Sequence, residues 1–326
     1  MTPDRQHPAP VSVVVLGPTA SGKSDVAMAL ASGPTRSGHF EIVAVDAMQV
    51  YRHMDIGTAK PSVADRAAVS HHLVDLVDPD HDFAVAEFSV AAATAMTEIT
   101  ARNHQALLVG GTGLYLRALT DPMEIPGTWP DIRAALEERA ATGAVTVMHA
   151  ELVELDPVAA TKMEPTNARR VVRALEVCLG SGRRFSSFGP GLDTYPKVPF
   201  VQFGLRWPRT ALTHRIEERV HRMVDAGLVA EVTRLVETFP DLSRTARQAL
   251  GYKELISHVV GDVSLDEAVA QVVVRTRQFA VRQERWFRRD PRVRWIEIHD
   301  DPVAESVPVI EDCLTSPDLR SIGPSS

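Results

Sequence analysis

The sequence of 326 residues has few cysteines and no long apolar run. Its two cysteines, Cys178 and Cys313, are too few for a disulfide framework or for a zinc site made of cysteines alone. No apolar stretch approaches the ~20 residues of a membrane-spanning helix, and the short, polar, proline-rich segment 1–10 lacks the apolar centre of a signal peptide. The composition therefore predicts a cytoplasmic protein with no membrane partner.

Charge is unevenly distributed along the chain. The net charge of −7 argues against a protein that coats nucleic acids non-specifically. Segment 275–294, however, has eight arginines against Glu284 and Asp290, and segment 169–184 has five arginines against Glu176. Two arginine-rich segments on an acidic chain predict local recognition of a phosphate-rich partner.

The most informative motif is a phosphate-binding loop. Residues 17–24, Gly-Pro-Thr-Ala-Ser-Gly-Lys-Ser, match the pattern G-x-x-x-x-G-K-[ST] completely. They lie between an apolar run and a helical pattern, and in such a loop the backbone N–H groups and the helix N-terminus bind phosphate. Lys23 supplies a positive charge, and the hydroxyl of Ser24 can bind Mg²⁺. The predicted diphosphate- or nucleotide-binding residues are Gly17, Pro18, Thr19, Ala20, Ser21, Gly22, Lys23 and Ser24.

Apolar runs that alternate with helical patterns predict an α/β fold. The expected strands are Val11–Leu16, Ile42–Val45, Ala106–Val109 and Phe200–Leu205. The expected helices are Ser24–Ala31, Phe83–Thr100, 210–239 and 264–289. This order indicates a parallel sheet of the phosphate-loop type with helices on both faces. Ligands bind such sheets at the carboxyl ends of the strands, where the phosphate-binding loop, Asp46 and Gly110-Gly111-Thr112 all fall.

Stretches rich in proline and glycine divide the chain. After residue 122 the pattern is helical without a clear strand until a loop rich in Ser, Gly and Pro at 186–199. The ends of the chain show little periodicity. The expected parts are a disordered N-terminus at 1–10, a phosphate-loop core at 11–122 and 200–299, a helical insertion at 123–199, and a flexible tail at 300–326.

Asp46 is the candidate for proton transfer or metal binding. It follows the expected strand Ile42–Val45 and could instead be a turn or helix-cap aspartate. The next strand ends in Gly110, where many nucleotide hydrolases have a metal-binding Asp, and the guanine-recognition motif Asn-Lys-x-Asp does not occur. The chain thus has the phosphate-binding loop without the usual machinery of nucleotide hydrolysis. We expect Gly110 to Gly113 to approach a large ligand, with Thr112 as a hydroxyl partner.

Segment 272–289 is expected to be an amphipathic helix with an arginine-rich side. At ~100° per residue its apolar residues fall on one side, and Arg275, Arg282, Arg285 and Arg289 fall on another. The arginine side fits contact with a phosphate backbone and fits a salt-bridged surface equally well.

Several strings of residues resemble one enzyme family. They are Val45-Asp46-Ala47-Met48-Gln49-Val50-Tyr51, Met54-Asp55-Ile56-Gly57-Thr58-Ala59-Lys60-Pro61, His71-His72-Leu73-Val74-Asp75, Gly110-Gly111-Thr112-Gly113-Leu114-Tyr115, Arg173-Ala174-Leu175-Glu176-Val177 and Gly251-Tyr252-Lys253-Glu254. In this order, within residues 11–290, they resemble the tRNA dimethylallyltransferases, also called tRNA isopentenyltransferases. The resemblance implies transfer of a dimethylallyl group from its diphosphate to N6 of adenosine 37, beside the anticodon of tRNA. It also implies a phosphate-loop core with a helical insertion, the use of Mg²⁺, and a monomer.

The resemblance further implies roles for individual residues. Asp46 resembles the base that accepts the adenine proton, Thr19 the hydroxyl beside the diphosphate, and Arg247 the arginine that binds the diphosphate. The residues that match positions in contact with the tRNA anticodon stem-loop are Asp46, Ala47, Met48, Gln49, Thr112, Arg133, Arg169, Arg170 and Arg173. The family commonly has Ser after the catalytic Asp, whereas this chain has Ala47.

Two other functions share some of these features. A small-molecule kinase could use the same loop to transfer the γ-phosphate of ATP, and it would be indifferent to tRNA. A non-catalytic, nucleotide-gated RNA-binding protein would keep all its measured outputs after the substitution Asp46→Ala. The favoured transferase would consume dimethylallyl diphosphate and require tRNA.

Overall fold

A computed structural model of the chain describes residues 12–33, 39–189 and 191–316. The chain divides into two compact units, one made of Met1–Thr120 and Lys197–Ser326 and the other of Asp121–Pro196. The second unit corresponds to the helical insertion expected at 123–199. The N-terminus expected to be disordered, 1–10, and the last part of the expected tail, 317–326, lie outside the described residues.

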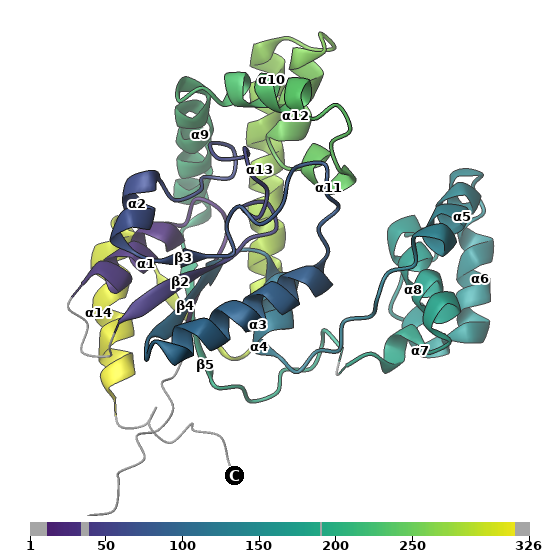
Figure 1. Cartoon of the computed structure of the whole chain (residues 1–326), viewed down its shortest axis with the longest axis horizontal. Helices are drawn as coiled ribbons and strands as arrows, with labels where there is room; N and C mark the ends of the chain where they lie inside the picture. Colours follow the sequence, from purple (N-terminus) through teal and green to yellow (C-terminus); the bar gives the residue numbers. More distant parts are fainter. Residues whose placement is uncertain (1–11, 34–38, 190, 317–326) are drawn as a thin grey trace, which may run out of the picture. The chain divides into compact units, whose positions relative to one another are not determined.

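A six-stranded parallel sheet forms the centre of the first unit (Figure 1). Its strands are β1 (Ser12–Leu16), β2 (Phe40–Val45), β3 (His71–His72), β4 (Gln105–Gly110), β5 (Phe200–Arg206) and β6 (Val293–Glu297). Their order across the sheet is β3-β2-β4-β1-β5-β6. The parallel α/β fold predicted from the sequence is therefore confirmed, and the sheet also contains two strands, β3 and β6, that the sequence pattern did not predict.

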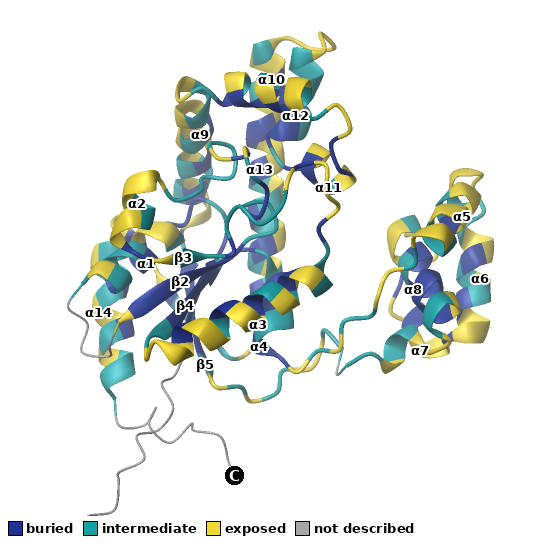
Figure 2. Ribbon diagram, viewed as in Figure 1, coloured by how far each residue is buried: buried dark blue, intermediate teal, exposed yellow. Residues whose placement is uncertain are grey.

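Both faces of the sheet are covered, which explains why its strands are continuous apolar runs. Along β1, Val13 and Val15 belong to one hydrophobic core, whereas Val14 and Leu16 belong to the other, as the alternation of side chains along a strand requires. All four are completely buried, and strand β2 of the same sheet is dark blue in Figure 2. One core includes residues of α3, α4, α10, α12 and α13, and the other includes residues of α1, α9 and α14.

The first unit contains more helices than the sequence pattern predicted. They are α1 (Lys23–Ser32), α2 (Val63–Ala68), α3 (Val85–Ala101), α4 (Gly113–Thr120), α9 (Arg209–Asp225), α10 (Leu228–Thr238), α11 (Arg244–Arg247), α12 (Tyr252–Val259), α13 (Leu265–Phe287) and α14 (Pro302–Thr315). The helix expected at 210–239 is two helices, because Gly227 has a φ of 99° and separates α9 from α10. The expectation of a flexible tail from residue 300 is wrong for α14, which the Asp301 carboxylate caps and which buries Ile310 in the core.

The second unit is helical throughout its regular structure, as the sequence predicted for this segment. Its elements are α5 (Pro130–Ala141), α6 (Val145–Leu155), α7 (Pro157–Ala160), α8 (Ala168–Ser181) and the short 3₁₀ helix η1 (Phe185–Ser187). They enclose a separate hydrophobic core that includes Met148, Leu152 and Leu175, each completely buried. Because it has its own core, the insertion is a distinct folding unit.

Candidate active site

Three strands of the first unit end side by side. In the sheet register, both Leu16 of β1 and Val45 of β2 pair with Gly110 of β4. The segments that follow these three strands therefore begin next to one another, as the sequence analysis expected for this edge of the sheet. Gly110 is required for this arrangement, because a Cβ atom there would lie 2.1 Å from the carbonyl oxygen of Val45.

Side chains from outside the motif fix the phosphate-binding loop. Gly17 lies against β5, since a Cβ atom on it would be 2.9 Å from the carbonyl oxygen of Leu205. Arg215 donates from Nε to the carbonyl of Ala20 at 3.0 Å, and Trp207 donates from Nε1 to the carbonyl of Ser21 at 3.1 Å. These contacts hold the backbone of the loop in one conformation, which a binding site for phosphate needs.

Positive charge is concentrated beside the loop. Lys23 Nζ donates to the carbonyl of Pro18 at 2.7 Å, and burial, together with the charge of Arg219, lowers the pKa of Lys23 to about 7 even though Asp46 favours its charged form. Burial also lowers the pKa of Arg219 itself, and the charge of Asp46 partly opposes this effect. Two cations that are costly to bury and that lie beside a phosphate-binding loop suit an anionic ligand.

Arg219 and Arg215 are site residues that the sequence analysis missed. They lie four residues apart on α9, so both project from one side of that helix toward the loop. The helix carries charges of both signs, as an ordinary solvated helix does. Its charge pattern therefore did not distinguish Arg215 and Arg219 from surface residues. The one available signal was the pair of arginines at i and i+4 shortly after the strand that returns to the sheet.

Asp46 has a local structural role and also faces the charges of the loop. Its Oδ1 accepts a hydrogen bond from the backbone N–H of Met48 at 2.8 Å, and Thr112 Oγ1 accepts one from the N–H of Ala47 at 3.3 Å. Its negative charge acts on both Lys23 and Arg219. The structure thus brings the phosphate-binding loop, Asp46 and Thr112 together, as predicted.

The segment that follows Asp46 is held by hydrogen bonds to its backbone. Gln49 donates from Nε2 to the carbonyls of Thr58 and Ala59, at 3.1 and 3.2 Å. The buried Glu231 carboxylate of α10 accepts hydrogen bonds from three successive N–H groups, those of residues 55, 56 and 57, at 2.8 to 3.2 Å. It also accepts a hydrogen bond from the hydroxyl of Tyr252 at 2.6 Å. These four bonds anchor the segment to α10 and α12.

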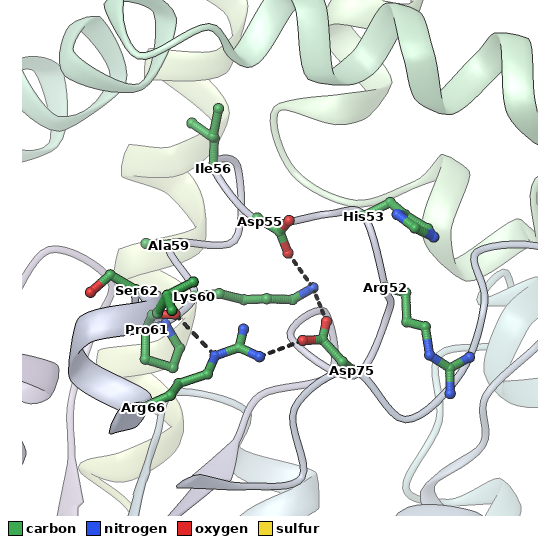
Figure 3. Close-up of a pocket in the computed structure, with 11 residues that line it drawn as sticks. Arg52, His53, Asp55, Ile56, Ala59, Lys60, Pro61, Ser62, Arg66 and Asp75 are labelled. Atoms are coloured by element: carbon green, nitrogen blue, oxygen red, sulfur yellow. Dashed lines mark hydrogen bonds and ion pairs between the residues drawn. The ribbon is translucent and has the colours of Figure 1, made fainter. Parts of the chain in front are cut away.

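An open pocket of about 590 Å³ is lined by part of this segment together with Arg66 and Asp75 (Figure 3). The buried Lys60 ammonium binds the carboxylates of Asp55 and Asp75, at 2.8 and 2.6 Å, and Arg66 binds Asp75 at 2.6 Å. Burial raises the pKa of Asp75, but the hydrogen bonds from Lys60 and Arg66 outweigh it and lower the pKa overall. Since carboxylates already pair with these cations, the ion pairs stabilise the segment.

Two of the predicted tRNA-binding arginines make contacts inside the insertion. Arg173 Nη1 lies 2.9 Å and Arg133 Nε 3.3 Å from the completely buried carboxylate of Glu176. That carboxylate also accepts a hydrogen bond from the N–H of Trp129 at 2.9 Å. Arg169 and Arg170 are exposed in the first turn of α8. The exposed pair is thus available to a ligand, whereas the guanidinium groups of Arg133 and Arg173 already neutralise a buried charge.

The remaining predicted cations differ in their surroundings. Arg247 is exposed on α11 and donates to the carbonyl of Pro240 at 3.4 Å, and no hydrogen bond or ion pair among the described residues links it to the phosphate-binding loop. On α13, Arg275 pairs with Glu254 and Arg277 pairs with Glu217. The exposed arginines on α13 or directly after it that have no acidic partner within the described ranges are Arg282, Arg285 and Arg289. This segment therefore combines a salt-bridged part with unpaired positive charge.

The hydroxyl of Ser24, at the start of α1, is an oxygen donor that could bind a magnesium ion. Ser24 is exposed in the first turn of this helix, directly after Lys23. In the described part of the chain, no three His, Cys, Asp or Glu side chains are grouped as metal ligands. Mg²⁺ often has only one or two protein ligands and takes the rest from phosphates and water, so a hydroxyl beside a phosphate-binding loop fits this ion.

Within the described ranges, no helix has both the length and the apolar character that a bilayer span requires.

Comparison with known proteins identifies the family. A family model described as IPP transferase matches residues 49–290. Over 303 residues the chain is 47% identical to the tRNA dimethylallyltransferase of Kineococcus radiotolerans, with 92% of this chain and 95% of that protein covered. The chain belongs to the tRNA dimethylallyltransferase family. The resemblance noted in the sequence is thereby confirmed.

Solved structures of this family share the fold. The full-length tRNA isopentenylpyrophosphate transferase of Bacillus halodurans superimposes with a TM-score of 0.68 at 34% identity, covering 96% of this chain and 98% of that one. The tRNA isopentenylpyrophosphate transferase of Staphylococcus epidermidis gives a TM-score of 0.66 at 30% identity, covering 94% and 98%. Membership of the tRNA dimethylallyltransferase family supports the transferase and not the small-molecule kinase.

Proposed function

We propose that the chain transfers a dimethylallyl group from dimethylallyl diphosphate to N6 of adenosine 37, next to the anticodon in tRNA, and releases diphosphate. The observation that carries this proposal is the convergence of Lys23, Arg219 and Asp46 at one edge of the sheet. Two cations there suit an anionic leaving group, and a carboxylate beside them suits the removal of a proton from an incoming amine. The chemistry needs both within one site.

The leaving group takes the positive side of the site. As the bond between C1 of the dimethylallyl group and the diphosphate oxygen breaks, its electron pair stays on the diphosphate. Lys23, Arg219 and the backbone N–H groups of the phosphate-binding loop stabilise that charge, and Thr19 offers a hydroxyl beside it. Ser24 would hold Mg²⁺, which when bound supplies further positive charge to the diphosphate.

The adenine is proposed to bind with its amine next to the Asp46 carboxylate. N6 forms the new bond to C1, and the proton that N6 loses goes to the Asp46 carboxylate, so atoms and charges balance. This amine is a weak nucleophile because its lone pair is delocalised into the ring, and general-base assistance typically contributes ~10²–10⁴ in rate. Gln49 Nε2 already donates to Thr58 and Ala59, which leaves its Oε1 to accept from the extruded base.

The proposal also covers the residues that contact tRNA, the metal dependence, the oligomeric state and the location of the enzyme. Residues proposed to contact the anticodon stem-loop are Asp46, Ala47, Met48, Gln49, Thr112, Arg133, Arg169, Arg170 and Arg173. For Arg133 and Arg173, the contacts with Glu176 favour a supporting role. Arg247 stays a proposed diphosphate ligand. We further propose, from the family resemblance, a Mg²⁺-dependent monomer in the cytoplasm.

A transfer assay tests the proposal. The protein is incubated with undermodified tRNA, Mg²⁺ and dimethylallyl diphosphate labelled in the prenyl group, and label in the RNA is measured. We expect labelling of tRNA with adenosine at position 37 and none of the same tRNA with guanosine there. Consumption of ATP with a small acceptor and no labelling of any tRNA would instead support a kinase.

A substitution tests the role of Asp46. Asp46→Asn should keep the affinity for tRNA and lower turnover by about 10²–10⁴, because the amide cannot accept the proton. Asp78→Asn is the matched control, since Asp78 is an exposed carboxylate paired with Arg52. If Asp46→Asn turns over as fast as the control, Asp46 is not the base.

A further inference from the structure

One side chain joins the phosphate-binding loop to the loop after β4. Gln283, on α13, is buried, with 8% of its surface exposed. Its Oε1 accepts a hydrogen bond from the N–H of Thr19 at 2.8 Å, and its Nε2 donates to the carbonyl of Gly111 at 2.9 Å. The carboxamide therefore uses its acceptor on one loop and its donor on the other.

The second loop fits closely against the same helix. A Cβ atom on Gly111 would lie 2.2 Å from Gln283 Nε2, and one on Gly113 would lie 2.1 Å from Trp286 Nε1. The Trp286 indole is rigid, so glycine at position 113 is needed for the loop to lie this close to α13. The intervening Thr112 accepts the N–H of Ala47.

These contacts form one continuous connection across the site. It runs from Thr19 through Gln283 and Gly111 to Thr112, and from there to Ala47, whose neighbour is Asp46. One end carries the proposed prenyl donor and the other carries the base for the adenine. The carboxamide of Gln283 supplies a neutral acceptor and a neutral donor from one group.

We propose that Gln283 is a positioning residue that sets the distance between the prenyl donor and the adenine amine. This inference rests on the proposed function. Reacting atoms must approach to about 3–3.5 Å, and a misplacement of about 1 Å can cost ~10² in rate. Gln283 acts on this distance through the two loops and without contact to either substrate.

Two substitutions separate the two hydrogen bonds. Gln283→Met keeps the length of the side chain and removes both bonds. Gln283→Glu keeps an acceptor for Thr19 but turns a carboxylate oxygen toward the carbonyl of Gly111. Thr276→Val is the matched control, because Thr276 is buried on the same helix and its hydroxyl donates to the carbonyl of Val272 within that helix.

The measurements separate positioning from binding and from folding. They are the single-turnover rate of prenyl transfer at saturating substrates, the Kd values for tRNA and for inorganic diphosphate, and the midpoint of thermal unfolding. For both Gln283 variants we expect the rate to fall by about 10- to 100-fold. We expect both Kd values to stay near those of the wild type, and the control variant to keep the wild-type rate.

Three results would overturn the inference. One is a wild-type rate in Gln283→Met. Another is a loss of rate that saturating substrates restore, which would assign Gln283 to binding. The third is a wild-type rate in Gln283→Glu, since the bond to Gly111 would then be unnecessary. Failure of the proposed function is distinct, because the wild-type protein itself would then leave tRNA unlabelled.

Discussion

The Arg219 guanidinium lies close enough to the Lys23 ammonium to lower its pKa, and the Asp46 carboxylate acts on both. Lys23 belongs to the phosphate-binding motif, whereas Arg219 comes from a helix about two hundred residues later in the chain. A diphosphate bound between the two would relieve the repulsion between them. This gives the anion a binding energy that grows as its charge develops during bond cleavage.

Arg219 is therefore expected to contribute more to leaving-group stabilisation than the exposed Arg247. Arg219→Gln should lower turnover by about 10²–10³, the usual loss for one donor to a developing anion. Arg247→Gln serves as the comparison, and we expect a smaller loss. Single-turnover prenyl transfer with saturating tRNA checks both. The reverse order of effects would restore the assignment made from sequence resemblance alone.

The sequence predicted the parts of the site that follow strands and motifs. The phosphate-binding loop, Asp46 and Thr112 were found because each follows an apolar run. Arg219 and Gln283 were not predicted as site residues. They lie on amphipathic helices, where only the packing of the folded chain shows which polar side chains are buried and which are solvated. Strand β3 has two residues and was too short for its alternation to be detected.

Strand β6 and helix α14 were also not predicted from the sequence, and in each case the reason is physical. Strand β6 begins inside the arginine-rich segment, and Arg294 on this strand is exposed while its neighbour Val293 is buried, so charge masked the apolar alternation. Helix α14 contains Pro308, which usually argues against a helix. Its buried face against α1 and β5 outweighs that cost.

Glu41 is predicted to make the fold sensitive to acid. Hydrogen bonds from Arg102, and also from His72 and His104, lower the pKa of this buried carboxyl to about 2 despite its burial. Because the pKa is lower in the folded chain, the stabilisation is fully present above about pH 4.5 and is lost as the pH falls toward 2.

The corresponding substitution is Glu41→Gln. At pH 7 it should lower the free energy of unfolding by about 3 kcal/mol, and the difference from wild type should shrink between pH 4.5 and pH 2. Urea denaturation at a series of pH values measures this. Glu237→Gln, at an exposed position of α10, is the control and should change little. A difference that is independent of pH would contradict the ion-pair explanation.

The anchor between Glu231 and the segment after Asp46 should affect tRNA more than the prenyl donor. Tyr252→Phe removes one of four hydrogen bonds to the carboxylate, which typically costs about 1.5–3 kcal/mol. A looser segment presents Gln49 less well, so we expect a higher KM for tRNA and an unchanged KM for dimethylallyl diphosphate. Glu231→Gln should have the same effect in larger measure, because its amide turns a donor toward backbone N–H groups. Equal changes in both KM values would show a general loss of structure.

The arginines of α8 are expected to divide into two groups. Exchange of both Arg169 and Arg170 for Ala should weaken tRNA binding and reduce the slope of log Kd against log salt by about 1 for each phosphate that the variant no longer neutralises. The unfolding midpoint should not change, because both side chains are exposed.

Arg173→Ala should instead destabilise the insertion by about 3–5 kcal/mol, since it leaves the charge of Glu176 buried with one partner fewer. Fluorescence anisotropy with an anticodon stem-loop at several salt concentrations, together with calorimetric unfolding, measures both quantities. If Arg173→Ala changes the salt slope while the insertion keeps its stability, this arginine binds phosphate and does not support the core of the insertion.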